Sequence, residues 1–575
     1  MRSDHPVTTL VLWIAGMTLG GLALARPATE RGSRVAPIDR GMIVALTAAA
    51  LAARLFELSY RPLFGGDEGN WGAVARAFLH DGGNPFGFGF LGFPALGEYV
   101  TAIALAIGGD TIAAVRTPAA VAGALTALVV TWYGVARWGR VAGVCAGFVV
   151  ATLPLHVHLS RQGLPNVVDA LLVALGMFAL EAAWARKRDA GFVVAGAALG
   201  MAQYVYTSAR AGPIIAAAWI ALRLAVPGKD AMQRARGLLA LLFVFALAVV
   251  PQALRVAADP AAWLAPIARR SDVPLLWAGI AHDPVAGTVV VLDRVAAAAG
   301  AFVFVPLRGL MVPAIPLLPA AYATAFLVGL LVVLRRWRDP RAQLLLVWLA
   351  VVLAMATVSE STPAGQRYAI AVPAAAIVTG IGVDGVAKLA ARAGIGARMI
   401  VVALVALLFV TQAAVALHHY FTEPKRWVSG GREPSTELAA DLAARIDAAP
   451  PGTRVAMLGA PRVWYHGLGQ LAFLHPATLA RDVEATEDAA AAVATICRDG
   501  ARRAEPHLDC LVVVLPHRAA DIPRIRARLP VSRETAVDAP DGLPLYTLLE
   551  ACAYCAPSPH QAGAKEPASV AGGTR

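Results

Sequence analysis

Charged residues are scarce in this chain, where Asp, Glu, Lys and Arg together make up 15% of the 575 residues. With 58% hydrophobic residues, the composition lies outside the range of soluble globular domains. The chain also has no Walker motif, no GxGxxG after a strand, no HExxH and no GxSxG. These absences argue against nucleotide hydrolysis, nucleotide-sugar binding and a lipase-type nucleophile.

Cysteine is also rare, with five residues in the chain. Cys145 lies within a hydrophobic run, and four others lie near the carboxyl end: Cys497, Cys510, Cys552 and Cys555. In an oxidising compartment two disulfides among these four are expected, and the sequence does not determine which cysteines pair. The CAYC pair could instead bind zinc, but no second CxxC or His pair lies at ligand spacing, which favours disulfides.

Long hydrophobic runs are abundant. About twelve of them approach the roughly 17 to 25 residues that a helix needs to cross a bilayer. They lie near residues 7–25, 41–58, 118–136, 141–155, 166–185, 191–207, 212–227, 237–253, 316–334, 342–358, 368–387 and 399–417. The first run lacks a basic n-region and a cleavage site, so we expect it to stay as a span. The sequence therefore predicts a polytopic α-helical protein of the plasma (inner) membrane.

The net charge of +12 comes from basic residues that lie between the hydrophobic runs. They form no single stripe or tail of the kind that nucleic-acid binding needs, so no nucleic-acid partner is expected. Arginine and lysine concentrate on alternate loops, which the positive-inside rule assigns to the cytoplasm. Both termini, the first long loop and the region after the last run are then external.

Composition predicts four parts along the chain. Residues 1–40 hold an extra N-terminal transmembrane helix with a basic cytoplasmic linker, and residues 41–417 hold the main transmembrane domain. In residues 418–555, β-like runs such as RVAMLG and CLVVVLP alternate with helical stretches such as TELAADLAARI, which is typical of a soluble α/β domain. Residues 556–575 are expected to be a disordered tail.

The first external loop, about 60–117, contains two amphipathic segments. In EGNWGAVARAFLHDGG, Trp71, Val74 and Phe78 follow the spacing of one helical face. In LGEYVTAIALAI, the apolar side is separate from the side that carries Glu98 and Thr101. Such helices are expected to lie along the membrane surface.

The stretch FGGDEGNW places Asp67 and Glu68 at the start of the first of these helices. One interpretation is purely structural: Asp67 caps the helix and Glu68 complements its dipole. The functional interpretation is that a carboxylate at the lipid–water boundary has a tuned pKa. It could then deprotonate an acceptor hydroxyl or hold a metal ion beside a phosphate.

The loops predicted to be external also carry basic and aromatic residues that could bind an anionic lipid headgroup. They are Arg116, His158, Arg161, Tyr206, Arg210, Arg367 and Tyr368. Arginine at a membrane edge is often only a snorkelling anchor. However, positive-inside bias should keep arginine out of external loops, and guanidinium binds phosphate bidentately. Both points favour a phosphate site.

A span followed by GDEGNWGAVARAFLHDGGNPF, later GMAQYVYTSARAG and then GQRYAIAVP resembles the membrane glycosyltransferases of the dolichyl-phosphate-mannose protein mannosyltransferase and aminoarabinose transferase type. These belong to glycosyltransferase family 39 and its relatives, with the GT-C fold, and the resemblance covers about residues 41–417. It implies that Asp67 is the catalytic acidic residue, with Glu68 as its motif partner. Glu98 resembles a position that some relatives use for acceptor or metal contact.

The resemblance also implies transfer of a sugar from a polyprenyl-phosphate donor to an acceptor at the outer face of the membrane. We expect an inverting displacement with Asp67 as general base and no obligatory cofactor, although a divalent cation could bind Asp67 and Glu68. The acceptor, whether protein, lipid or glycan, stays open. The main alternative is a transporter or flippase for an anionic lipid-linked substrate, which should show inverted repeats that this sequence lacks.

Overall fold

The computed structural model describes residues 6–24, 36–186, 188–226, 231–309, 314–422, 434–499, 510–529, 531–539 and 542–551. Its contacts divide the chain into two compact units. The first, called the helical unit below, comprises Met1–Pro62 and Val74–Arg432. The second, called the sheet unit, comprises Leu63–Ala73 and Glu433–Arg575. The short segment with the acidic pair, expected to belong to the transmembrane domain, therefore groups with the C-terminal residues.

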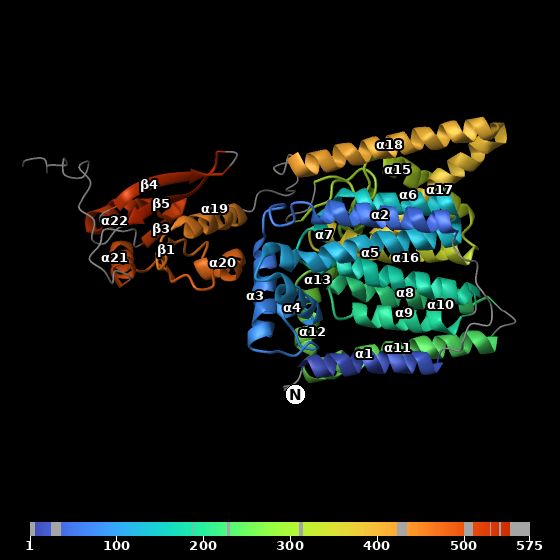
Figure 1. The fold of residues 1–575 in the computed structure, drawn as a ribbon, viewed down its shortest axis with the longest axis horizontal. Coiled ribbons are helices and arrows are strands. Elements are labelled where there is room, and N and C mark those ends of the chain that lie inside the picture. Colours follow the sequence, from blue (N-terminus) through green and yellow to red (C-terminus); the bar gives the residue numbers. More distant parts are fainter. Residues whose placement is uncertain are drawn as a thin grey trace, which may run out of the picture. The chain divides into compact units, whose positions relative to one another are not determined.

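The helical unit is a bundle of long helices with shorter ones between them (Figure 1). In chain order they are α1 (Pro6–Leu24), α2 (Pro37–Leu55), α4 (Leu96–Gly108), α5 (Ile112–Trp138), α6 (Arg140–Thr152), α7 (Pro154–Ser160), α8 (Asn166–Arg186), α9 (Asp189–Ala202), α10 (Ala211–Leu224), α11 (Ala231–Ala258), α12 (Pro260–Ala268), α13 (Val273–His282), α14 (Pro284–Gly300), α15 (Ala320–Arg335), α16 (Pro340–Thr357), α17 (Val372–Ala390) and α18 (Ile395–Thr422). Short 3₁₀ turns η1 (Phe90–Gly92), η2 (Thr207–Arg210), η3 (Gly365–Ala371) and η4 (Ala391–Ala393) join some of them. Helix α3 (Gly66–His80) begins in the sheet unit and ends in the helical unit.

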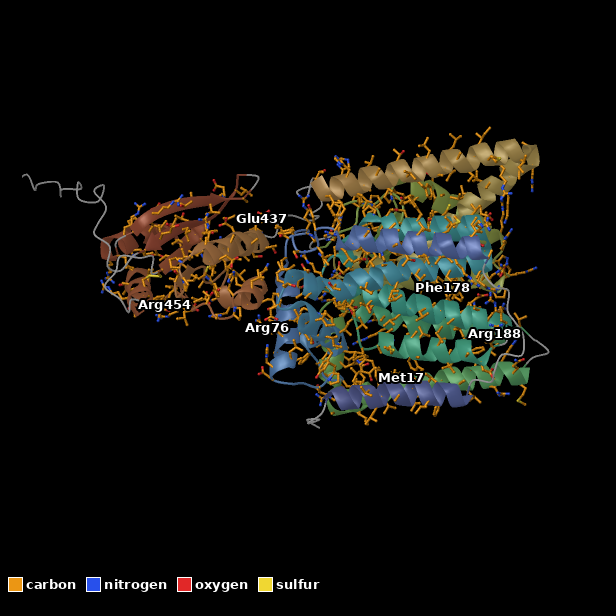
Figure 2. All side chains as sticks on the ribbon, viewed as in Figure 1. Met17, Arg76, Phe178, Arg188, Glu437 and Arg454 are labelled. Carbon is orange, nitrogen blue, oxygen red and sulfur yellow. A yellow bond between two sulfur atoms is a disulfide. The ribbon has the colours of Figure 1, made fainter. Side chains whose placement is uncertain are left out.

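Small residues and aromatic rings fill the interior of this bundle. A β-carbon at Gly329 would lie 1.8 Å from the carbonyl oxygen of Val378, so only glycine lets α15 approach α17 this closely. Between α5 and α8, the rings of Tyr133 and Phe178 stack with centroids 3.9 Å apart. Phe178 lies within the bundle of helices (Figure 2). Packing of this kind lets helices associate where lipid offers no hydrophobic driving force between them.

Each hydrophobic run expected to span the membrane overlaps at least one of these helices, and the run at 141–155 is divided between α6 and α7. Among the described residues, six helices are long and apolar enough to cross a bilayer, or up to seven if the bent pair α6 and α7 forms one span. The chain is thus a multi-pass membrane protein, while the count of about twelve spans stays a prediction. Helix α18 continues to Thr422, a few residues beyond the expected end of the transmembrane domain.

Both expected amphipathic helices of the first long loop are present as α3 and α4. In α4, Glu98 and Thr101 are buried, whereas Ile103 and Ile107 are 52% and 85% exposed. The polar side of this helix therefore packs against protein and part of its apolar side is left uncovered. An uncovered apolar face is what a helix at a membrane surface presents to lipid.

The sheet unit contains a five-stranded sheet in the order β2-β1-β3-β5-β4 (Figure 1). Its strands are β1 (Arg454–Leu458), β2 (Ala480–Asp482), β3 (Cys510–Val514), β4 (Val531–Asp538) and β5 (Pro544–Ala551). Strand β1 is parallel to β2 and β3, whereas β5 is antiparallel to β3 and β4. This mixed sheet agrees with the β-like runs RVAMLG and CLVVVLP.

Helices cover both faces of the sheet, which agrees with the continuous burial of successive residues in β1 and β3. One face packs against α19 (Pro434–Ala448) and α20 (Gly469–Leu474), with the turn η6 (Tyr465–Gly467) beside them. The other packs against α21 (Ala489–Asp499) and α22 (Ile522–Arg528), which follows the turn η7 (Pro516–Asp521).

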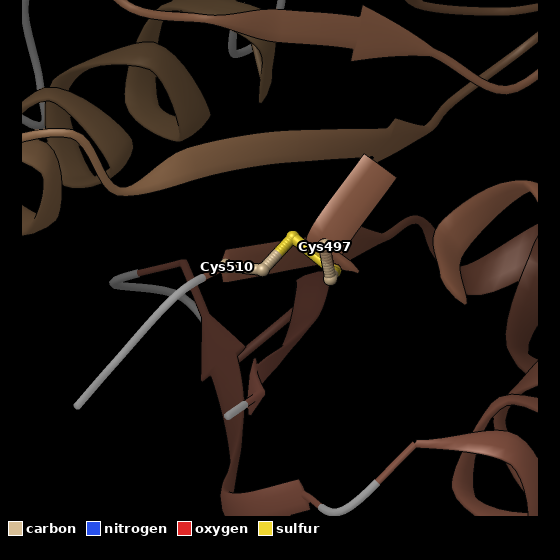
Figure 3. The surroundings of a disulfide bond; sticks show 2 residues. All are labelled: Cys497 and Cys510. Carbon is tan, nitrogen blue, oxygen red and sulfur yellow. A yellow bond between two sulfur atoms is a disulfide. The ribbon is translucent and has the colours of Figure 1, made fainter. Parts of the chain in front are cut away.

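A disulfide joins Cys497 at the end of α21 to Cys510 at the start of β3 (Figure 3). It accounts for one of the two disulfides expected from the sequence and assigns its pairing. Cys552, Cys555 and the tail at 556–575 lie outside the described residues.

Candidate active site

The acidic pair lies in the first turn of α3, which begins at Gly66. Glu68 is 1% exposed, and its Oε2 accepts a hydrogen bond from the backbone N–H of Gly65 at 2.9 Å. This contact is one half of a capping box, in which the acidic residue at the third helical position reaches back to the N-cap. Asp67 is the exposed member of the pair. Glu68 therefore makes a capping hydrogen bond, in addition to the dipole role expected from the sequence.

A second group of predicted site residues meets at the hydroxyl of Tyr206. This oxygen accepts hydrogen bonds from Nη1 of Arg270 and from Nη1 of Arg367, each at 3.0 Å. Tyr206 and Arg367 are 6% and 4% exposed, and Arg270 is half-buried. We call these three residues the Tyr206 cluster. Two guanidinium groups held this close form a concentrated positive charge of the kind that recognises phosphate.

A buried carboxylate fixes the backbone next to this cluster. Asp169, in the first turn of α8, is fully buried and accepts three hydrogen bonds from the turn η2. The donors are the backbone N–H groups of Tyr206 and Ala209, at 3.1 and 2.9 Å, and the hydroxyl of Ser208 at 2.5 Å. Three such bonds leave the turn little freedom, so Asp169 serves to place Tyr206.

Arg270 is the member of the cluster that sequence reasoning missed. It follows α12, in a stretch between two of the expected spans. The signal was the pair Arg269 and Arg270 in a loop expected to be external, where the positive-inside rule disfavours arginine.

Tyr368 is not part of the cluster, although it follows Arg367 in the chain. It is fully buried, and its hydroxyl donates to the backbone oxygen of Ala298 in α14 at 2.8 Å. Tyr368 therefore anchors η3 to α14. That anchor helps to hold Arg367 in place.

The guanidinium groups of Arg116 and Arg161 donate hydrogen bonds to main-chain oxygens. Both are fully buried. Nη1 of Arg116 donates to the backbone oxygens of Leu58 and Pro62, both at 2.9 Å. Arg161 donates to four backbone oxygens, those of Ala53, Arg54, Glu57 and Arg61, at 2.9 to 3.3 Å. These arginines close the carboxyl end of α2 and the turn after it, a placement that does not support the expected contact with a lipid phosphate.

His158 and Arg210 also have local roles. His158 is 3% exposed, with Nδ1 3.3 Å from the hydroxyl of Tyr420 and Nε2 3.2 Å from Nε2 of Gln162. The guanidinium of Arg210 lies 3.5 Å from the ring centroid of Trp263 and donates to the backbone oxygen of that residue. Burial lowers the pKa of Arg210 to about 10, an effect that Asp169 opposes, so this arginine stays charged at neutral pH.

Glu98 is fully buried in α4 and accepts a hydrogen bond from the backbone N–H of Phe90 at 2.7 Å. Burial raises its pKa to about 8, against the smaller opposing effect of the Phe90 hydrogen bond. The loop that Glu98 holds carries Phe93, whose ring lies 5.0 Å from that of Tyr206 and 5.5 Å from the guanidinium of Arg270. Glu98 thus supports a wall of the Tyr206 cluster.

Within the described part of the chain, no three His, Cys, Asp or Glu side chains gather in an arrangement that could hold a metal ion. Asp67 and Glu68 differ in exposure, and Glu68 already binds the backbone of Gly65. A divalent cation at the pair therefore stays a prediction that rests on Asp67.

Comparison with known proteins identifies the fold of this chain. Residues 93–254 match the family model described as dolichyl-phosphate-mannose-protein mannosyltransferase. A crystal structure of ArnT from Cupriavidus metallidurans bound to undecaprenyl phosphate superposes with a TM-score of 0.54 at 15% identity, covering 89% of this chain and 98% of that chain. The apo structure of the same protein gives a TM-score of 0.55 with the same identity and coverage. This chain has the GT-C fold.

The expected resemblance to GT-C membrane glycosyltransferases is thereby confirmed. Among curated proteins, none matches the sequence. The family-model match includes Glu98, Arg116 and the residues up to Arg210, but it begins after the acidic pair and ends before Arg270 and Arg367. The roles of the acidic pair, Arg270 and Arg367 therefore have to be argued from the geometry of this chain.

Proposed function

We propose that this protein transfers a sugar from a polyprenyl-phosphate donor to an acceptor hydroxyl at the outer face of the membrane. The observation that carries the proposal is the Tyr206 cluster, where two arginines meet on one hydroxyl. It is supported by the GT-C fold shared with ArnT, a protein whose structure contains undecaprenyl phosphate.

In the proposed reaction, the phosphate of the donor lies against Arg270 and Arg367. Guanidinium groups suit this role because they pair with phosphate oxygens through two hydrogen bonds each. Tyr206 holds the two cations together before the donor arrives, so little reorganisation is needed at the moment of reaction.

Asp67 acts as the general base. It takes the proton of the acceptor hydroxyl while the acceptor oxygen forms a bond to the anomeric carbon of the sugar. The bond from that carbon to the phosphate oxygen breaks, and the electron pair leaves with the polyprenyl phosphate. The leaving phosphate gains one negative charge, which the two arginines stabilise. One displacement of this kind inverts the configuration of the anomeric carbon.

Transfer of a radiolabelled sugar tests this proposal. The full-length protein in lipid is given a panel of polyprenyl-phosphate sugars and acceptors, with Asp67→Asn and Arg270→Gln as variants. Each variant should lower kcat/KM by about 100-fold or more. The matched control is Arg269→Gln, which removes an exposed arginine next to Arg270 and should leave transfer unchanged.

The alternative function, transport or flipping of an anionic lipid, predicts a different result. The wild-type protein would then bind the lipid and move it across the bilayer without forming any glycosylated product.

A different outcome concerns Asp67 alone. If wild type and Asp67→Asn transfer sugar at the same rate, Asp67 is not the general base and has only a structural role.

A further inference from the structure

The segment with the acidic pair packs on α20 of the sheet unit through a contact between main chains. A β-carbon added at Gly69 would lie 2.2 Å from the carbonyl carbon and oxygen of Gly469, and 2.4 Å from the backbone nitrogen of Gln470. Real β-carbons do not approach a backbone this closely, and a backbone cannot swing aside as a flexible side chain can. Only glycine at position 69 therefore permits the contact.

The same contact also requires glycine at position 469. A β-carbon at Gly469 would lie 2.2 Å from the backbone oxygen of Gly66 and 2.6 Å from Cγ of Asn70. The first turn of α3 and the first turn of α20 are thus pressed together, with a glycine on each side. Asp67 and Glu68 lie between Gly66 and Gly69 in the chain.

Side chains extend the contact on both sides of the glycines. The rings of Phe64 and Phe473 lie with centroids 5.7 Å apart. Gln470 is 2% exposed, and its Nε2 lies 3.4 Å from the hydroxyl of Thr436 in α19. A β-carbon at Gly66 would lie 3.5 Å from Oε1 of Gln470. The acidic turn is therefore packed against both α20 and the side chain that links α20 to α19.

Burial within the acidic turn follows the same pattern. Phe64, Glu68 and Gly69 are buried, whereas Asp67 is exposed. Packing fixes the backbone on either side of Asp67 while its own carboxylate stays accessible. This is the arrangement that a positioned general base needs, because it must be rigid and must still reach its substrate.

We infer that the sheet unit is a positioning domain for the catalytic carboxylate, and that Gly469 and Gln470 are its positioning residues. The inference rests on the proposed function, since it assigns the sheet unit a part in the reaction that Asp67 is proposed to catalyse.

The test compares Gly469→Ala with Gly467→Ala in the full-length protein in lipid. Position 467 lies two residues away and is exposed, and an added β-carbon would meet nothing closer than 4.0 Å. Two quantities are measured: amide hydrogen exchange of residues 65–71, and kcat and donor KM for sugar transfer. Exchange reports local opening of the turn, independently of catalysis.

Gly469→Ala should speed exchange in residues 65–71 and lower kcat by about 100-fold, with the donor KM unchanged, because displacement of a base by about 1 Å affects the chemical step. Gly467→Ala should behave as wild type in both measurements. Unchanged exchange in Gly469→Ala would overturn the inference, and so would faster exchange with an unchanged kcat.

Two further results keep the inference separate from the proposed function. If the wild type transfers no sugar, the proposed function fails, while exchange still decides whether α20 holds the acidic turn. If Gly469→Ala does not fold, Phe473→Leu loosens the same contact more gently. It should give a smaller change in the same two quantities, and no change in either would overturn the inference.

Discussion

Two pairs of arginines in the helical unit make different kinds of hydrogen bond. Arg116 and Arg161 donate to main-chain oxygens around the end of α2, so their hydrogen bonds hold the fold together. Arg270 and Arg367 donate to one side-chain hydroxyl, that of Tyr206. Under the proposed function, the same residue type thus holds the main chain in one place and binds the donor phosphate in another.

The largest expected effect is on catalysis. Arg367→Gln should lower kcat/KM for sugar transfer by about 100- to 1,000-fold, because it removes a cation from the leaving phosphate. The melting temperature should change little, which transfer assays and thermal unfolding in detergent can establish together. A large fall in melting temperature would instead show that Arg367, like Arg161, mainly stabilises the fold.

The reverse result is expected for Arg161→Gln. This change leaves several buried backbone oxygens without donors, which should cost roughly 3 kcal/mol or more of stability. Thermal unfolding measures the loss, with Arg269→Gln as a control that removes an exposed arginine. A variant that melts like wild type but no longer binds donor lipid would show that Arg161 belongs to the site after all.

A pH-dependent effect concerns Glu98, which supports the loop beside Arg270. Its pKa of about 8 in the folded protein exceeds that of an unfolded glutamate, near 4.3, so the folded form binds the extra proton. Stability should therefore fall as the pH rises from about 4.5 to 8, by up to about 1.4 kcal/mol per pH unit. Glu98→Gln should lose this dependence when melting temperature is measured against pH. An identical slope in the variant would contradict it.

The smallest effect is expected at Arg210, which stacks on Trp263 and belongs to neither pair. Arg210→Leu should cost about 1 kcal/mol of stability, the usual scale of a cation–π contact. Donor KM should stay within about twofold of wild type, since Arg210 lies outside the Tyr206 cluster. A rise in KM as large as that of Arg270→Gln would extend the phosphate site to Arg210.

Much of the architecture could be predicted from the sequence because it depends on local pattern. Hydrophobic runs gave the helices, the 3.6-residue spacing gave α3 and α4, and β-like runs gave β1 and β3. The position of the acidic pair at a helix start followed from the same pattern. Such features depend only on residues that are close to one another in the sequence.

What could not be predicted depends on partners distant in the chain. The acceptors of Arg161 lie about a hundred residues earlier, in α2 and the turn after it, so no local pattern distinguishes it from Arg367. Arg270 was missed for the same reason, because Tyr206 and Arg367 define its role. The buried side of α4 and the grouping of the acidic turn with α20 likewise arise only from tertiary packing.

The disulfide between Cys497 and Cys510 has a practical consequence for handling the protein. Since it closes a loop between α21 and β3, a single proteolytic cut inside that loop leaves both pieces covalently joined. On a denaturing gel, the nicked chain would run close to the intact one until a reductant is added. Paired reducing and non-reducing lanes are therefore the simplest quality check for any preparation used in the assays above.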